Sequence, residues 1–97
     1  MPKNAELINA VARLSKEFHT IETSLAANGQ GPDGIVKSIT LTLDKLLFAV
    51  SNNLIVGREI REGLEKSCAV AVRVFEGSGI EDDLFDIRNL LENYAPN

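Results

Sequence analysis

The stretch LINAVARLSKEFHTIETSL, residues 7–25, carries the clearest structural pattern in the chain. Its large apolar side chains recur at alternating steps of four and three residues, at Leu7, Val11, Leu14, Phe18, Ile21 and Leu25. This spacing places them on one side of an α-helix and is typical of the contact seam of a helical bundle or coiled coil. Asn4 is a suitable N-cap, and Gly29 can adopt the left-handed conformation that ends many helices. The pattern therefore predicts a helix over residues 4–27.

Turn-forming residues separate this helix from a second one. The segment NGQGPDG, residues 28–34, predicts a loop. An apolar series with the helical period follows it, at Ile35, Ile39, Leu43, Leu46, Leu47, Val50 and Leu54. Ser51, Asn52 and Asn53 are poor residues for a helix interior and good ones for a turn. We therefore expect a second helix over 34–51 and a third over 54–76, with Gly57 as an alternative hinge.

The third and fourth helices show the same type of spacing. The third has a stripe at Ile60, Leu64, Cys68, Ala71 and Phe75, and the fourth has one at Ile80, Leu84, Ile87, Leu91 and Tyr94. The segment Gly77-Ser78-Gly79 separates them, and Ser78 with Glu81 matches the S-x-x-E capping box that starts many helices.

Two segments also match a β-strand, because residues 38–43 alternate apolar and polar side chains and residues 69–75 are rich in valine. They leave an α+β fold open as the alternative. The helical template accounts for more apolar positions than the strand template does. The predicted fold is thus all-α, an antiparallel bundle of about four helices, in a single domain over residues 1–97.

Composition limits the location and partners of the protein. No apolar run approaches the ~20 residues that cross a bilayer, and the N-terminus lacks a basic region followed by a long apolar one. We therefore expect a cytoplasmic protein without a membrane partner. The net charge of −4 arises entirely in residues 58–97, which carry five basic and nine acidic side chains. Such a surface repels phosphate backbones, so we expect no nucleic-acid partner.

The candidate binding site is an aromatic residue surrounded by acids. On a helical projection Phe85 lies well away from the seam of the fourth helix, so we expect it not to face the core. The helix dipole accounts for acids in the first turn but not for those further on. We therefore predict a partner-binding site formed by Glu81, Asp82, Phe85, Asp86 and Glu92. Two alternatives for Phe85 are a wider core face of this helix and a contact within a homodimer.

No residue pattern predicts catalysis, a cofactor or a metal. His19, the sole histidine, has Glu22 three residues on, but lacks the further ligands of a metal site and the nucleophile that a general base activates. It is expected to be a surface residue. Cys68, the sole cysteine, falls on the stripe of the third helix, which predicts a small buried side chain and not a reactive thiol.

These observations favour a non-enzymatic binding protein, a regulator, adaptor or inhibitor whose acidic C-terminal helix contacts a protein with a basic surface. A narrower alternative is an acidic inhibitor of a nucleic-acid-handling enzyme, similar in kind to the small acidic bundles among bacterial immunity and phage counter-defence proteins. The other alternative is a structural assembly, most simply a homodimer. It follows if the apolar residues off the predicted stripes are exposed and need cover: Val36, Leu41, Phe48, Ile55, Val70, Val72 and Val74.

Overall fold

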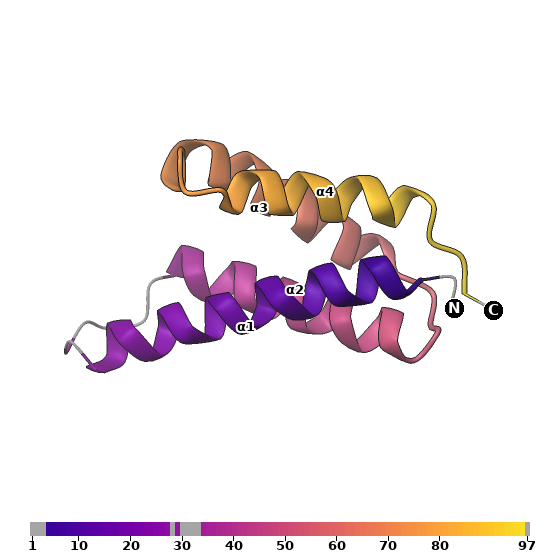
Figure 1. Ribbon diagram of the computed structural model, residues 1–97, viewed down its shortest axis with the longest axis horizontal. Helices are drawn as coiled ribbons and strands as arrows, with labels where there is room; N and C mark the ends of the chain where they lie inside the picture. Colours follow the sequence, from indigo (N-terminus) through magenta and orange to yellow (C-terminus); the bar gives the residue numbers. More distant parts are fainter. Residues whose placement is uncertain (1–3, 28, 30–33, 97) are drawn as a thin grey trace.

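The computed structural model describes residues 4–27, 29 and 34–96, and it contains four α-helices (Figure 1). Their bounds are Ala5–Ala27 for α1, Gly34–Ser51 for α2, Arg58–Val74 for α3 and Ile80–Glu92 for α4. Each helix packs on the next along the chain, and α1 also packs on α4, which closes the four into a bundle of 44 × 24 × 23 Å. The predicted all-α bundle is confirmed. None of the helices described is long and apolar enough to cross a membrane.

The stripes predicted for α1, α3 and α4 form most of the core. In α1 the first four members are buried and Ile21 and Leu25 are half-buried, and all five members of the α4 stripe are buried. In α3 the central members Leu64, Cys68 and Ala71 are buried. Steps of three and four residues therefore identified the inward faces of these three helices correctly.

The stripe of α2 differs from the prediction at both ends. Ile35 and Leu54, which were expected on the stripe, are 40% and 45% exposed, whereas Val36, expected off the core, is buried. The inward face of α2 begins at Val36 and continues through Ile39, Thr40 and Leu43. Leu54 is excluded because α2 ends before it, at Ser51.

The α+β alternative is wrong for both segments. Residues 38–43 lie inside α2, and residues 69–74 lie inside α3 with Phe75 as its C-cap. The threonines that produce the strand-like alternation are accommodated by hydrogen bonds along the helix. Thr40 Oγ1 donates to the carbonyl of Val36 at 2.8 Å, and Thr42 Oγ1 donates to that of Ser38 at 3.0 Å. Such bonds let a threonine satisfy its hydroxyl within a helix.

The break after α2 lies where the sequence predicts it, but α3 begins later than expected, at Arg58 and not at residue 54. Asn53 has φ = 56°, and the amide of Leu54 donates to the carbonyl of Ala49 at 2.8 Å, the bond that closes a Schellman turn. An extended segment follows, in which Val56 is buried and Gly57 is the N-cap of α3. The alternative hinge at Gly57 is therefore also used.

The turn between α3 and α4 has a capping arrangement shifted by one residue from the predicted box. The N-cap of α4 is Gly79, in the left-handed conformation with φ = 87°. The side chain of Ser78 accepts from the amide of Ile80 at 3.2 Å, and the carboxylate of Glu81 accepts from the amide of Gly77 at 3.1 Å. The predicted capping box of Ser78 and Glu81 does not form, because the left-handed glycine adds one residue between Ser78 and the first helical turn.

The N-terminal end of α1 is tied to the C-terminal segment. Asn4 precedes α1 and is buried, and its carbonyl accepts from the amide of Ile8 at 3.0 Å. Its side-chain amide donates to the carbonyl of Ala95 at 3.3 Å, so the start of α1 lies beside the segment that follows α4 (Figure 1). The phenol of Tyr94 donates to the carbonyl of Leu54 at 2.6 Å. The C-terminal residues thus hold both the start of α1 and the loop after α2.

The helices α2 and α3 approach closely at Gly63. A Cβ atom at this position would lie 3.0 Å from Oγ1 and 3.3 Å from Cγ2 of Thr42. A glycine in a helix interior costs about 1 kcal/mol relative to alanine. Its presence here is explained by the small distance between the two helices.

We expect Gly63→Val to lower the free energy of unfolding by about 1–3 kcal/mol, because its methyl groups would occupy space held by Thr42. Urea denaturation measures the change. Ala69→Val introduces the same side chain at an exposed position of the same helix, and it should change stability by no more than about 0.5 kcal/mol. Equal losses in the two variants would mean that valine is simply unfavourable in α3 and would contradict the close approach.

Candidate functional site

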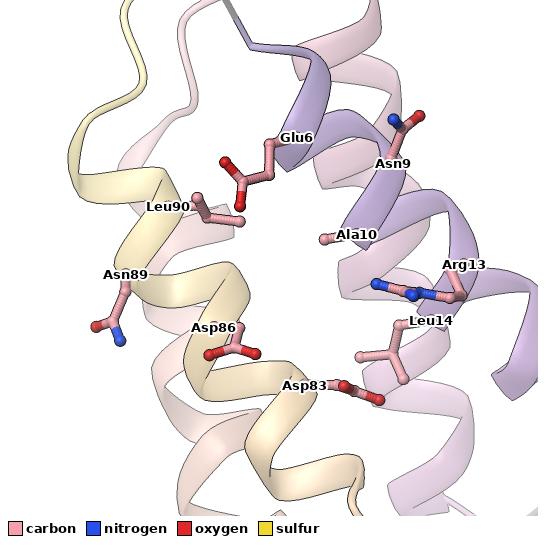
Figure 2. Close-up of a pocket in the computed structure, with 9 residues that line it drawn as sticks. All are labelled: Glu6, Asn9, Ala10, Arg13, Leu14, Asp83, Asp86, Asn89 and Leu90. Atoms are coloured by element: carbon pink, nitrogen blue, oxygen red, sulfur yellow. The ribbon is translucent and has the colours of Figure 1, made fainter.

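A groove of about 420 Å³ runs between α1 and α4 (Figure 2). Its apolar side chains are Ala10 and Leu14 of α1 and Leu90 of α4. Its polar side chains are Glu6, Asn9, Arg13, Asp83, Asp86 and Asn89. Leu14 belongs to the buried stripe of α1, and the other lining residues of the two helices lie beside the stripes. We refer to this site, defined by these nine residues, as the α1–α4 groove.

The charges of the α1–α4 groove are unbalanced. Three carboxylates, Glu6, Asp83 and Asp86, share it with one guanidinium, Arg13, and all four side chains belong to exposed residues. Figure 2 shows Glu6 and Arg13 reaching from α1 toward α4. Within the described part of the chain none of the four takes part in an ion pair. These four side chains therefore give the groove a formal charge of −2.

The structure divides the predicted site between two flanks of α4. Asp86 lies in the α1–α4 groove, as does Asp83 three residues before it. Glu81, Phe85 and Glu92 follow one another at steps of four and seven, which places them together on the opposite flank, toward α3. Asp82 is exposed and is not part of the groove lining. The five predicted residues therefore do not form one continuous surface.

The expectation that Phe85 lies away from the core is wrong. Phe85 is half-buried and packs against the hydrophobic core, so the alternative of a wider core face of α4 is the one found. The guanidinium of Arg88 lies 5.0 Å from the centre of its ring and also pairs with Glu65 of α3 at 3.5 Å. This cation–π contact covers the ring from the α3 side. Phe85 thus contributes to the packing of α4 on α3.

Two predicted acids have different surroundings. Glu81 is half-buried, and one of its carboxylate oxygens accepts from the amide of Gly77, while the other is buried without a hydrogen-bond partner in the part of the chain described. The carboxylate of Glu81 is therefore part of the hydrogen bonding of the turn before α4. Glu92 is exposed near the end of α4 and lies outside the groove. Whether Glu81, Asp82, Phe85, Asp86 and Glu92 bind a partner stays a prediction.

The contribution of α1 to the groove was missed by sequence reasoning. Glu6, Ala10 and Arg13 follow steps of four and three, which is a signal for one flank of the helix. That signal does not say which other helix the flank faces. Only the packing of α1 on α4 brings Glu6 and Arg13 next to Asp83 and Asp86.

A polar cluster links α1 to α2 on another side of the bundle. The carboxylate of Asp44 accepts a hydrogen bond from the hydroxyl of Ser15 at 2.6 Å, and one of its oxygens lies 2.9 Å from Nε2 of His19. His19 is exposed, as predicted, but its partner is Asp44 and not Glu22. The serine bonds to the carboxylate and not to the imidazole, so this is not the order of a nucleophile activated by histidine. The cluster therefore links α1 to α2 through side-chain hydrogen bonds.

Cys68 is buried in the core, as its position on the stripe predicts. Burial raises the pKa of its thiol, an effect that Arg88 opposes and Glu65 reinforces. Among the described residues no three His, Cys, Asp or Glu side chains lie where they could hold a metal ion together.

The chain has no match to a protein-family model, to a curated protein or to a solved structure. Its function is therefore inferred from the physical properties of its own surface.

Replacement of Asp44 tests the tie between α1 and α2. We expect Asp44→Ala to lower the free energy of unfolding by about 1–3 kcal/mol, because the hydroxyl of the buried Ser15 loses its acceptor. Asp86→Ala removes an exposed carboxylate that has no ion pair and should change stability by less than about 0.5 kcal/mol. Thermal or urea denaturation of both variants makes the comparison. A loss of the same size in Asp86→Ala would mean that the groove acids are structural.

The raised pKa of Cys68 predicts a pH dependence of stability. Above the ordinary thiol pKa of 9.0 the unfolded chain ionises while the folded chain keeps its proton, so the unfolded state binds fewer protons and stability falls as pH rises. Cys68→Ala lacks this effect. The stability difference between wild type and variant should therefore shrink from about pH 7.5 to about pH 10, measured by urea denaturation. A constant difference would contradict the raised pKa.

Proposed function

We propose that the protein acts by binding another protein and not by catalysis, with the α1–α4 groove as the contact site. The observation that supports this proposal is the presence of three carboxylates around one groove with a single guanidinium and no ion pair among them. Side chains of this kind leave the groove complementary to lysine or arginine. The partner is accordingly a protein with a basic surface, which makes the chain a regulator, adaptor or inhibitor.

The groove combines charge with an apolar floor, and both are needed for affinity. An exposed ion pair contributes only about 0–1 kcal/mol by itself. The long stem of a lysine or arginine can also pack on the half-buried Ala10 and Leu90 while its charged end reaches the carboxylates. The exposed acids Asp82 and Glu92 on the same helix extend the negative field, which increases the rate of encounter with a basic partner.

A narrower candidate is an inhibitor of a nucleic-acid-handling enzyme, and the charge of α4 favours it. Between Ile80 and Glu92 this helix carries five acids and one base, 5 − 1 = 4 negative charges in excess. Exposed carboxylates on a rigid helix can compete for a surface that otherwise holds phosphates. For such a partner, added oligonucleotide should displace the protein. For a partner of another class it should not.

Charge reversal at one position tests the proposed function. We expect affinity capture with the wild-type chain to retain a partner that Asp86→Lys binds at least about tenfold more weakly, because a lysine would face the partner's basic residues. Glu76→Lys makes the same change in total charge at an exposed site outside the groove. Binding of the purified partner to the three proteins is measured by calorimetry at low and high salt. Equal affinities for wild type and Asp86→Lys, or equal losses in both variants, would contradict a contact at the groove.

A further inference from the structure

The two large apolar side chains with the highest exposed fractions in the described part of the chain, Ile55 and Phe48, lie where α2 turns into α3. Phe48 is 65% exposed, Leu54 45% and Ile55 81%, and Ile60 beside them is half-buried. Together with Ala49 they line an open hollow of about 450 Å³, and its charged lining residues in the described part of the chain are Asp44 and Lys45. We refer to Phe48, Leu54, Ile55 and Ile60 as the apolar patch. Contiguous exposed apolar surface of this kind marks an interaction site in most soluble proteins.

The backbone under the apolar patch is held in place. The amide of Leu54 donates to the carbonyl of Ala49 at 2.8 Å, and the carbonyl of Leu54 accepts from the phenol of Tyr94 at 2.6 Å. On the other side of Ile55, Val56 is buried and its carbonyl accepts from Nε of Arg61 at 3.2 Å. The exposure of Leu54 and Ile55 is therefore a property of an anchored loop. A surface that is already ordered loses little conformational entropy on binding.

We propose that a second copy of this chain covers the apolar patch, so that the protein is a two-fold symmetric dimer through its α2–α3 turn. The patch contains both a projecting side chain, Ile55, and a hollow beside it. In a two-fold interface the same patch faces itself, and each copy supplies both complementary features to the other. Ile55 of each copy can thus occupy the hollow of its partner copy.

The charges around the patch favour a second copy. Nζ of Lys45, a residue that lines the hollow, lies 3.6 Å from Oε1 of Glu59, so a pair of opposite charges lies beside the patch. Because this pair carries no net charge, two copies of it do not repel each other, and the lysine of one copy can pair with the glutamate of the other across the interface. The excess negative charge lies on α4, which is diagonal to α2 in the bundle. A dimer through the patch keeps the two acidic helices apart, which limits their repulsion.

The exposed apolar surface also continues along α2. Leu41, 54% exposed and seven residues before Phe48 on α2, can extend the contact.

The test is the solution mass across a range of protein concentrations, by light scattering and sedimentation equilibrium. We expect wild type to be a dimer that dissociates on dilution. Ile55→Lys should raise the dissociation constant at least roughly 30-fold, because a charge would enter the apolar hollow. Position 55 lies in a loop and is 81% exposed, so the variant should keep the wild-type circular dichroism spectrum and melting behaviour of its monomer.

Val72→Lys is the matched control, since it also adds one positive charge at an exposed apolar position, on α3 outside the patch. It should remain a dimer. A wild-type chain that stays monomeric at high concentration would overturn the proposal, and so would a dimer that Ile55→Lys leaves intact or that Val72→Lys disrupts equally. Asp86→Lys should dimerise like wild type, which separates this result from the fate of the proposed groove function.

Discussion

The fold depends on the burial of the apolar faces of all four helices in one core, and the rings of Phe18 and Phe75 meet there. Phe18 is completely buried in α1, and its ring meets that of Phe75 edge to face, with centroids 5.8 Å apart and planes at 88°. The contact joins α1 to the end of α3, which is not its neighbour in the ring of helices. Aromatic pairs in this geometry contribute beyond the area that they bury. The contact between the two rings therefore links the end of α3 to the core face of α1.

Once the inward faces are used for the core, the remaining flanks differ in chemistry. The flanks of α1 and α4 meet with exposed acids around a small apolar floor. The turn between α2 and α3 instead presents apolar side chains on an anchored loop. The two surfaces belong to different pairs of helices, so one can bind a charged partner while the other is covered. A small bundle can in this way separate assembly from recognition, because each surface has its own chemistry and its own helices.

Sequence patterns predicted the structure correctly where a local interaction decides where a helix ends. Asn53 and Gly29 adopt the left-handed conformation at the ends of α2 and α1, because few other residues tolerate it. The patterns were less reliable where the burial of a side chain depends on which other helix packs beside it. Phe85 lies off the narrow stripe of α4, yet it is half-buried because α3 lies beside that flank and Arg88 covers its ring. A projection of one helix does not contain this neighbour.

The sequence by itself determined the number of helices, most of their ends and the inward face of α1, α3 and α4, because these depend on the spacing of apolar residues and on turn chemistry within a few positions. It also determined that the excess negative charge lies in the last helix. Only the tertiary structure decided that Glu6 and Arg13 share a groove with Asp83 and Asp86, and that Ile55 stands exposed on a fixed loop. The physical reason is that both features arise between segments far apart in the chain. The geometry of the groove and of the loop depends on how the helices pack around their shared core. The spacing of apolar residues within one helix does not predict that packing.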